Sequence, residues 1–203
     1  QVHQLFALDE TLFSSHQVSL VSHSEMKAMS ALKTPSDALA VFAKPNDQSL
    51  SQSKLILALE SIQDPGNLGA CIRTANAVGC DLIIKRKSNS SPISPAVHKA
   101  SCGGTSGLYI FESNDLNGIV KKLKNNNIRV IGTDHRATTH YLKLNESNCD
   151  AICVIMGSED TGISRALKSS CNNLFSIPIK GTVDCLNISV ACGIILYEIA
   201  KYR

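Results

Sequence analysis

The chain has 203 residues, of which 43% are hydrophobic and 18% are charged, and its formal net charge is +3. This composition supports a packed core and excludes a disordered chain, while the small charge permits a nucleic-acid partner without indicating one. The aromatic content is 4%, with no Trp, which argues against an aromatic platform for stacking single-stranded bases.

The eight cysteines are scattered through apolar segments and never form a C-x-x-C pair. Zinc sites need closely spaced ligands, so we expect no metal. Free cysteines in apolar segments act as small hydrophobes, which indicates a reducing compartment and a cytoplasmic location. We expect no membrane partner, because no apolar run is long enough to span a bilayer. The start at Gln1, without an initiator Met or a signal pattern, suggests a fragment of a longer protein.

Residues 1–45 contain short strand candidates and one short helix, and a linker is expected over residues 46–53. From residue 54, apolar strands and amphipathic helices alternate. The expected strands are 55–59, 81–84, 108–111, 129–132, 151–156 and 174–177, and the expected helices are 68–78, 114–125, 164–170 and 187–202. This alternation predicts an α/β domain over residues 54–203, with a mainly parallel sheet, helices on both faces and a ligand beyond the carboxyl ends of the strands.

Two basic clusters lie within this domain, one at Lys85, Arg86 and Lys87 and the other at 121–124. Either cluster could contact RNA. A solvated surface patch is the simpler interpretation of each cluster taken alone.

The first segment that could contribute functional side chains covers residues 64–75, at a turn that leads into a helix. We expect Asn67 to cap this helix, and Arg73 to lie nearly two turns further on beside apolar neighbours. A planar guanidinium at this place suits a phosphate. A capped helix with a salt-bridged arginine is the alternative interpretation.

The second segment, residues 154–164, runs from a buried strand into a turn with Gly157 and Gly162, and then into a helix. Glycines let a backbone approach a ligand closely. The segment lacks the Gly-Lys-Ser/Thr ending of a P-loop, and Glu159 would repel a phosphate there. An ordinary corner between strand and helix is the alternative.

The third segment, residues 177–191, leaves a strand at Pro178, crosses a polar loop and enters an apolar helix near Asn187. Asn187 and Ser189 both lie in the first turn of this helix. Helix capping alone would explain both residue types at these positions.

In this order and after successive strands, the three segments together resemble the motifs of the SpoU (TrmH-like) RNA 2′-O-ribose methyltransferases of the SPOUT superfamily. The family patterns are N-x-G-x-x-x-R-T-A, G-x-E-x-x-G and I-P-(x)n-S-L-N-x-S-x-A, which match residues 67–75, 157–162 and 177–191. The resemblance extends over about residues 53–203, and residues 1–45 are more loosely similar to the end of a small RNA-binding domain. Cys185 replaces the Ser of the third motif, and a thiol is a poor hydrogen-bond donor.

The resemblance implies a C-terminal trefoil knot, a rare exception to the usual rule against threading. It also implies a homodimer that binds S-adenosylmethionine and acts on RNA, with rRNA favoured over tRNA. The implied cofactor-binding residues are Thr133, Gly157, Ile177 and Leu186. The implied catalytic residues are Arg73, Asn67, Glu159, Asn187 and Ser189.

The implied reaction is methyl transfer to a ribose 2′-hydroxyl. A guanidinium stays protonated in proteins, so we expect Arg73 to hold a neighbouring phosphate and to stabilise charge on the attacking oxygen, not to act as a base. Three alternatives are a catalytically silent RNA-binding relative, an unrelated α/β enzyme that binds a nucleotide, and a SPOUT enzyme that methylates a base nitrogen. The sequence leaves open which RNA and nucleotide are modified, and which subunit supplies Arg73.

Overall fold

The computed structural model describes residues 2–13, 17–30, 32, 34–42, 50, 52–146, 150–158 and 161–201. The chain divides into two compact units, Gln1–Asn46 and Asp47–Arg203. Most of the linker expected over residues 46–53 lies outside the described residues, and so does the predicted site residue Glu159.

The first unit is a small three-stranded sheet with one helix. The central strand runs parallel to one neighbour and antiparallel to the other. Its helix begins at a capping box, in which Ser22 and Glu25 each bond to the backbone of the other. In chain order the elements are β1 (Val2–Ala7), η1 (Glu10–Leu12), β2 (Ser19–Leu20), α1 (His23–Met29) and β3 (Ala38–Phe42). Among the described residues of this unit, the buried apolar side chains are Leu5, Ala7 and Met26, which form a small core.

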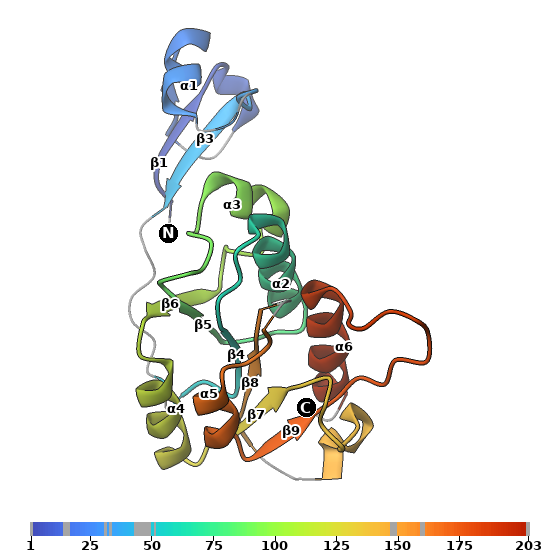
Figure 1. Cartoon of the computed structure of the whole chain (residues 1–203). Coiled ribbons are helices and arrows are strands. Elements are labelled where there is room, and N and C mark those ends of the chain that lie inside the picture. The colour runs from blue at the N-terminus through green and yellow to red at the C-terminus, as the bar shows by residue number, and fades with distance from the viewer. Residues whose placement is uncertain are drawn as a thin grey trace. The chain divides into compact units, whose positions relative to one another are not determined.

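The second unit is built on a six-stranded sheet in the order β6-β5-β4-β8-β7-β9 (Figure 1), and every neighbouring pair is parallel. β4 consists of five consecutive buried apolar residues, as expected for a strand that is covered on both faces. The strands are β4 (Leu55–Leu59), β5 (Leu82–Arg86), β6 (Tyr109–Ser113), β7 (Arg129–Thr133), β8 (Ile152–Met156) and β9 (Asn173–Phe175). The predicted parallel sheet is confirmed.

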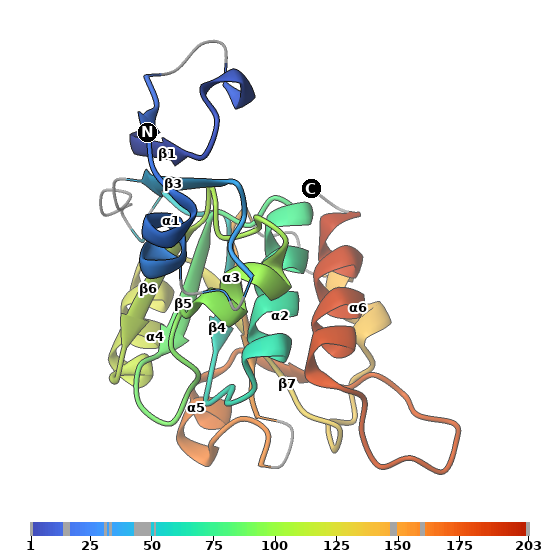
Figure 2. The ribbon, with the colours of Figure 1, turned by 90° about the horizontal axis from the view of Figure 1, so that it is seen from above.

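Helices cover both faces of this sheet, as predicted. One buried cluster joins the sheet to α2, α3 and α6, and a second cluster joins the other face to α4 and α5 (Figure 2). The helices are α2 (Pro65–Ala77), α3 (Pro95–Ser101), α4 (Leu116–Asn125), α5 (Arg165–Ser170) and α6 (Ile188–Ala200), with a 3-10 helix η2 (Tyr141–Glu146). None of the helices in the described ranges combines the length and apolar character that a bilayer crossing requires.

The predicted cap of the first helix of this domain is wrong. α2 begins at Pro65, and the side chain of Asp64 accepts a hydrogen bond of 2.6 Å from the backbone N of Asn67. Aspartate followed by proline is a strong helix start, because proline needs no hydrogen-bond acceptor for its nitrogen. Asn67 therefore lies inside the first turn, and its side chain is not used as the cap.

The first basic cluster is not a surface patch. The side chain of Lys85 is only 1% exposed, and its Nζ donates to Oε1 of Glu112 at 2.8 Å and to the carbonyl of Arg86 at 3.0 Å. Arg86 in turn donates from Nη1 to Oε1 of Glu60 at 2.9 Å. Only Lys87 of the three is exposed. The solvated-patch interpretation holds for the second cluster, whose members Lys121, Lys122 and Lys124 are all exposed.

Replacing Glu112 by leucine is expected to lower the free energy of unfolding by about 2 kcal/mol, because the Lys85 ammonium would then stay buried without its counter-charge. Lys85→Met should cost less than about 1 kcal/mol, because Glu112 is 40% exposed and can be solvated. Urea unfolding followed by circular dichroism measures both values. Equal losses in the two variants would contradict this asymmetry.

Candidate functional site

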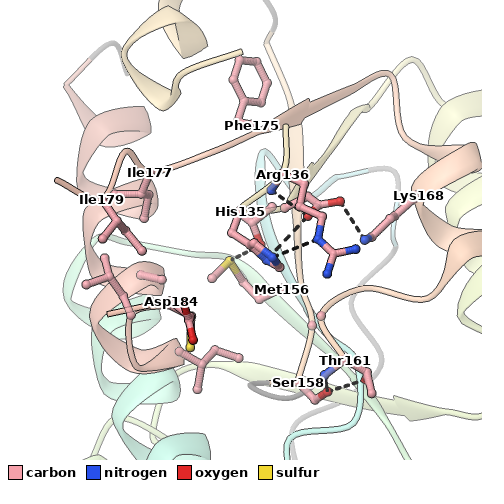
Figure 3. Close-up of a pocket in the computed structure, with 18 residues that line it drawn as sticks. His135, Arg136, Met156, Ser158, Thr161, Lys168, Phe175, Ile177, Ile179 and Asp184 are labelled. Atoms are coloured by element: carbon pink, nitrogen blue, oxygen red, sulfur yellow. Dashed lines mark hydrogen bonds and ion pairs between the residues drawn. The ribbon is translucent and has the colours of Figure 1, made fainter. Parts of the chain in front are cut away.

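A cavity of about 510 Å³ opens beyond the carboxyl ends of β7, β8 and β9 (Figure 3). This edge is where parallel α/β sheets bind their ligands, and the volume falls within the range of small-molecule sites. The last residue of β7, Thr133, lines the cavity, and so do the residues that follow β8 and β9. The far wall comes from the loop before α6 and from the start of α6 itself.

The four residues predicted to bind the cofactor all line this one cavity: Thr133, Gly157, Ile177 and Leu186. Thr133 Oγ1 donates to the carbonyl of Ile155 at 3.4 Å and lies 3.5 Å from Sδ of Met156, which ties the end of β7 to the end of β8. Segments that are far apart in sequence thus converge because parallel strands end at the same edge.

The turn after β8 is closed tightly around Gly157. The backbone N of Gly162 donates to the carbonyl of Ser158 at 2.9 Å, and the hydroxyls of Ser158 and Thr161 are 2.7 Å apart. A Cβ at residue 157 would lie 2.0 Å from the carbonyl carbon of Gly162 and 2.2 Å from its oxygen. The turn itself therefore requires glycine here, which is a different reason from the expected close approach of a ligand.

The cavity has an apolar wall and a charged rim. Met156, Phe175 and Ile179 contribute to the wall. On the opposite side, Nζ of Lys168 lies 2.7 Å from Oδ2 of Asp134. His135 and Arg136 also line this side of the cavity, and Figure 3 shows them near Lys168. A flat apolar group and a charged group can therefore be held in the same cavity.

The charged rim centres on Asp134, whose Oδ1 also accepts from the backbone N of Arg136 at 3.0 Å. Partial burial raises the pKa of this carboxyl, but the hydrogen bonds from Lys168 and Arg136 and the nearby positive charges outweigh burial and leave the pKa below its ordinary value. Asp134 is therefore ionised at neutral pH. This rim was not predicted, although a carboxylate two residues after the strand expected over residues 129–132 is a usable signal.

Three of the predicted catalytic residues form a connected group at the starts of α2 and α6. Asn187 caps α6, since its Oδ1 accepts from the backbone N of Ser189 at 2.9 Å and from its Oγ at 2.6 Å. Nδ2 of Asn187 donates to Oδ1 of Asn67 at 3.0 Å. Capping thus explains part of what Asn187 and Ser189 do, and the bond to Asn67 links the first motif to the third.

Arg73 lies apart from this group. It is exposed on α2, and its Nη1 donates to Sγ of Cys102 at 3.3 Å, where α3 ends in a left-handed residue. It does not line the cavity. Within the part of the chain that the structure describes, Arg73 forms no ion pair, so the alternative of a salt-bridged arginine gains no support. Over the same described part, no group of three or more metal-binding side chains is found.

A parallel sheet with a cavity of this size at its carboxyl edge defines an α/β domain with a candidate small-molecule site. The model of the SpoU rRNA Methylase family matches residues 54–197. The chain therefore belongs to the SpoU rRNA methylase family. The α/β fold is that of the SPOUT neighbours described below, whereas the trefoil knot stays a prediction.

Two curated relatives are 23S rRNA (guanosine-2′-O-)-methyltransferases named RlmB. The protein from Coxiella burnetii is 36% identical over 149 residues, which cover 73% of this chain and 59% of the relative. The protein from Vibrio cholerae is 34% identical over 161 residues, which cover 77% of this chain and 64% of the relative. The chain thus spans less than two thirds of the length of either relative.

Solved structures agree with this family. A TrmH-family protein from Porphyromonas gingivalis has a TM-score of 0.84 at 26% identity, over 100% of this chain and 82% of that one. The SpoU methyltransferase AviRb from Streptomyces viridochromogenes, solved in complex with AdoMet, has a TM-score of 0.82 at 20% identity, over 99% of this chain and 83% of that one. At 20% identity, the similarity to AviRb shows a shared fold and nothing more.

Proposed function

We propose that this chain transfers a methyl group from S-adenosylmethionine to a ribose 2′-hydroxyl of RNA. The observation that carries the proposal is the convergence of Thr133, Gly157, Ile177 and Leu186 on one cavity. The names of the curated relatives support rRNA over tRNA as the substrate, and guanosine as the nucleoside. The alternative, a catalytically silent RNA-binding relative, has no observation in its favour.

The residues of the cavity fit S-adenosylmethionine. A planar adenine can lie against the apolar part of the lining, to which Phe175, Ile177 and Leu186 contribute. The charged amino-acid end suits the rim of Asp134 and Lys168, which offers both signs of charge. When bound, the cofactor supplies an electrophilic methyl group to the ribose oxygen.

The chain's own residues must orient the acceptor and lower the cost of removing its proton. In our proposal the Arg73 guanidinium holds an RNA phosphate and stabilises the negative charge that develops on the 2′-oxygen. The bonded group of Asn67, Asn187 and Ser189 keeps the starts of α2 and α6 together beside the cavity. We also propose Glu159 as a site residue, because it matches the Glu of the family motif G-x-E-x-x-G.

We further propose that two copies of the chain associate. Val190 and Tyr197 are 51% and 56% exposed on α6, and Leu142 is 56% exposed on η2, which packs against α6. Exposed apolar side chains of this size are favoured at subunit interfaces. A second copy would also offer a way for Arg73 to reach a cavity that it does not line in its own chain. We also propose that the protein is cytoplasmic, as its free cysteines indicate.

Alkylation should distinguish Cys185 from Cys102. Both are exposed, but only Cys185 lines the cavity. Burial raises the pKa of Cys171 to about 11 and that of Cys153 still further, so these thiols should react slowly. At about pH 8, S-adenosylmethionine is expected to slow the iodoacetamide labelling of Cys185 at least roughly tenfold and to leave Cys102 unchanged.

Peptide mass spectrometry measures both labelling rates in the same sample, so Cys102 is an internal control. S-adenosylhomocysteine should protect Cys185 in the same way, and ATP should not. Equal labelling of Cys185 with and without either adenosyl compound, together with no heat of binding by calorimetry, would contradict the proposed cofactor site and would favour the silent relative.

A further inference from the structure

A second cavity, of about 360 Å³, adjoins the first. The two share Ser158, Thr161 and Ile188 as common wall residues. The second cavity lies towards the carboxyl end of β4 and the start of α2, and residues 61–64 and Asn67 contribute to its lining. A group bound in it would therefore be next to a ligand in the first cavity.

The lining of the second cavity is polar but almost uncharged. It presents the amides of Gln63, Asn67 and Asn89 with several hydroxyls, and among the described lining residues Asp64 alone is ionisable. Asp64 is already engaged as the cap of α2. This chemistry does not suit a phosphate. Amides, which carry a donor and an acceptor side by side, match the edge of a nucleobase.

Two of these amides are available for a ligand. Among the residues that the structure describes, neither Gln63 nor Asn89 has a side-chain hydrogen-bond partner, and both are exposed. By contrast, Asn67 is bonded to Asn187. Gln63 and Asn89 come from different loops, after β4 and after β5, so that together they can approach one planar ligand from two sides.

The backbone holds both loops in an uncommon conformation. Ser61 and Asn89, which line the second cavity, have φ values of 60° and 53°, and they are two of the four non-glycine residues with positive φ among those described. The loop after β4 is fixed by two bonds to the carbonyl of Ile62, from the Ser91 backbone N at 2.7 Å and from Ser90 Oγ at 3.1 Å. Left-handed residues held in this way recur at binding sites.

We propose that the second cavity is the acceptor-nucleoside pocket, in which Gln63 and Asn89 read the edge of the target base. This inference rests on the proposed methyl transfer. The ribose would then face the shared wall of Ser158, Thr161 and Ile188, beside the methyl donor. A third cavity, which shares Ser61, Asn89 and Thr161, is lined by Arg165 and by the ion pair of Arg86 with Glu60. Arg165 thus adds a positive charge on the side where the RNA backbone would continue.

The test compares two asparagine-to-glycine variants. Glycine tolerates positive φ, so Asn89→Gly removes the amide and keeps the backbone. Asn127→Gly is the matched control, because Asn127 also has a left-handed φ, of 58°, and is exposed after α4, outside the second cavity. Both variants, with Gln63→Ala, are assayed with total bacterial RNA and labelled S-adenosylmethionine, and cofactor affinity is measured by calorimetry.

For Asn89→Gly and for Gln63→Ala we expect kcat/KM for RNA to fall roughly tenfold, with cofactor affinity and melting temperature unchanged. Digestion to nucleosides should also show a wider range of methylated bases. Asn127→Gly should behave as the wild type. Unchanged kcat/KM and unchanged base identity in both cavity variants would overturn the inference, and so would a parallel loss of cofactor affinity. A wild type that binds the cofactor but methylates no ribose would overturn the proposed function itself.

Discussion

Replacing Arg73 by alanine is expected to lower kcat for methyl transfer by roughly 10²–10³-fold and to leave the affinity for S-adenosylmethionine unchanged. The guanidinium does not line the cavity that we propose for the cofactor, so its loss should not disturb cofactor binding. It is also exposed and bonded only weakly, to Cys102 Sγ at 3.3 Å, so the fold should tolerate the change. Calorimetry and a steady-state assay on the same preparation separate these effects.

Two further variants sharpen this test. Arg73→Lys keeps the charge but loses the planar fork, so we expect it to recover only a small part of the rate. Lys122→Ala removes an exposed cation from α4, on the opposite face of the sheet, and should act as the wild type. A rate for Arg73→Ala near that of Lys122→Ala would show that Arg73 has no part in the reaction.

Replacing Gly157 by alanine is expected to abolish measurable cofactor binding, with a loss of affinity of at least roughly a hundredfold. The added Cβ would meet the backbone of Gly162 and Ile163 at 2.0 to 2.2 Å, so the turn after β8 must open. Because backbone atoms cannot rotate away, we also expect a loss of about 3 kcal/mol in the free energy of unfolding. Calorimetry and urea unfolding measure the two effects.

Gly181→Ala is the matched control. Gly181 lies in the loop before α6, and nothing lies within 4 Å of the position that its Cβ would take. This variant should retain both stability and cofactor affinity. Normal cofactor affinity in Gly157→Ala would mean that the turn after β8 does not shape the site, and the assignment of that cavity would then fail.

Much of the second unit's architecture follows from local sequence. The run Leu55–Leu59 predicts β4 to the residue, because five consecutive apolar side chains followed by a polar turn fit a short strand that is buried on both faces. α3 was not predicted, because its seven residues show too little hydrophobic periodicity and its buried residues are Val97 and Ser101. The burial of Lys85 was not predicted either, because a lysine in the sequence does not reveal that neighbouring side chains cover it.

The candidate site is predictable only in part. The residues predicted to bind the cofactor follow only from the family resemblance, since no local pattern links Thr133 with Leu186. The rim of Asp134 and Lys168 depends on β7 and α5 meeting in space, which is a tertiary contact. The cap at Asp64 and the bond between Asn67 and Asn187 likewise do not follow from the sequence, because several polar residues compete for each helix start.

The most direct test of the central claim is nucleoside analysis after the purified chain has been incubated with total bacterial RNA and methyl-labelled S-adenosylmethionine. We predict label in a 2′-O-methylated nucleoside, foremost 2′-O-methylguanosine from rRNA. Label confined to methylated bases would contradict the account, as would RNA without label in the presence of tightly bound cofactor.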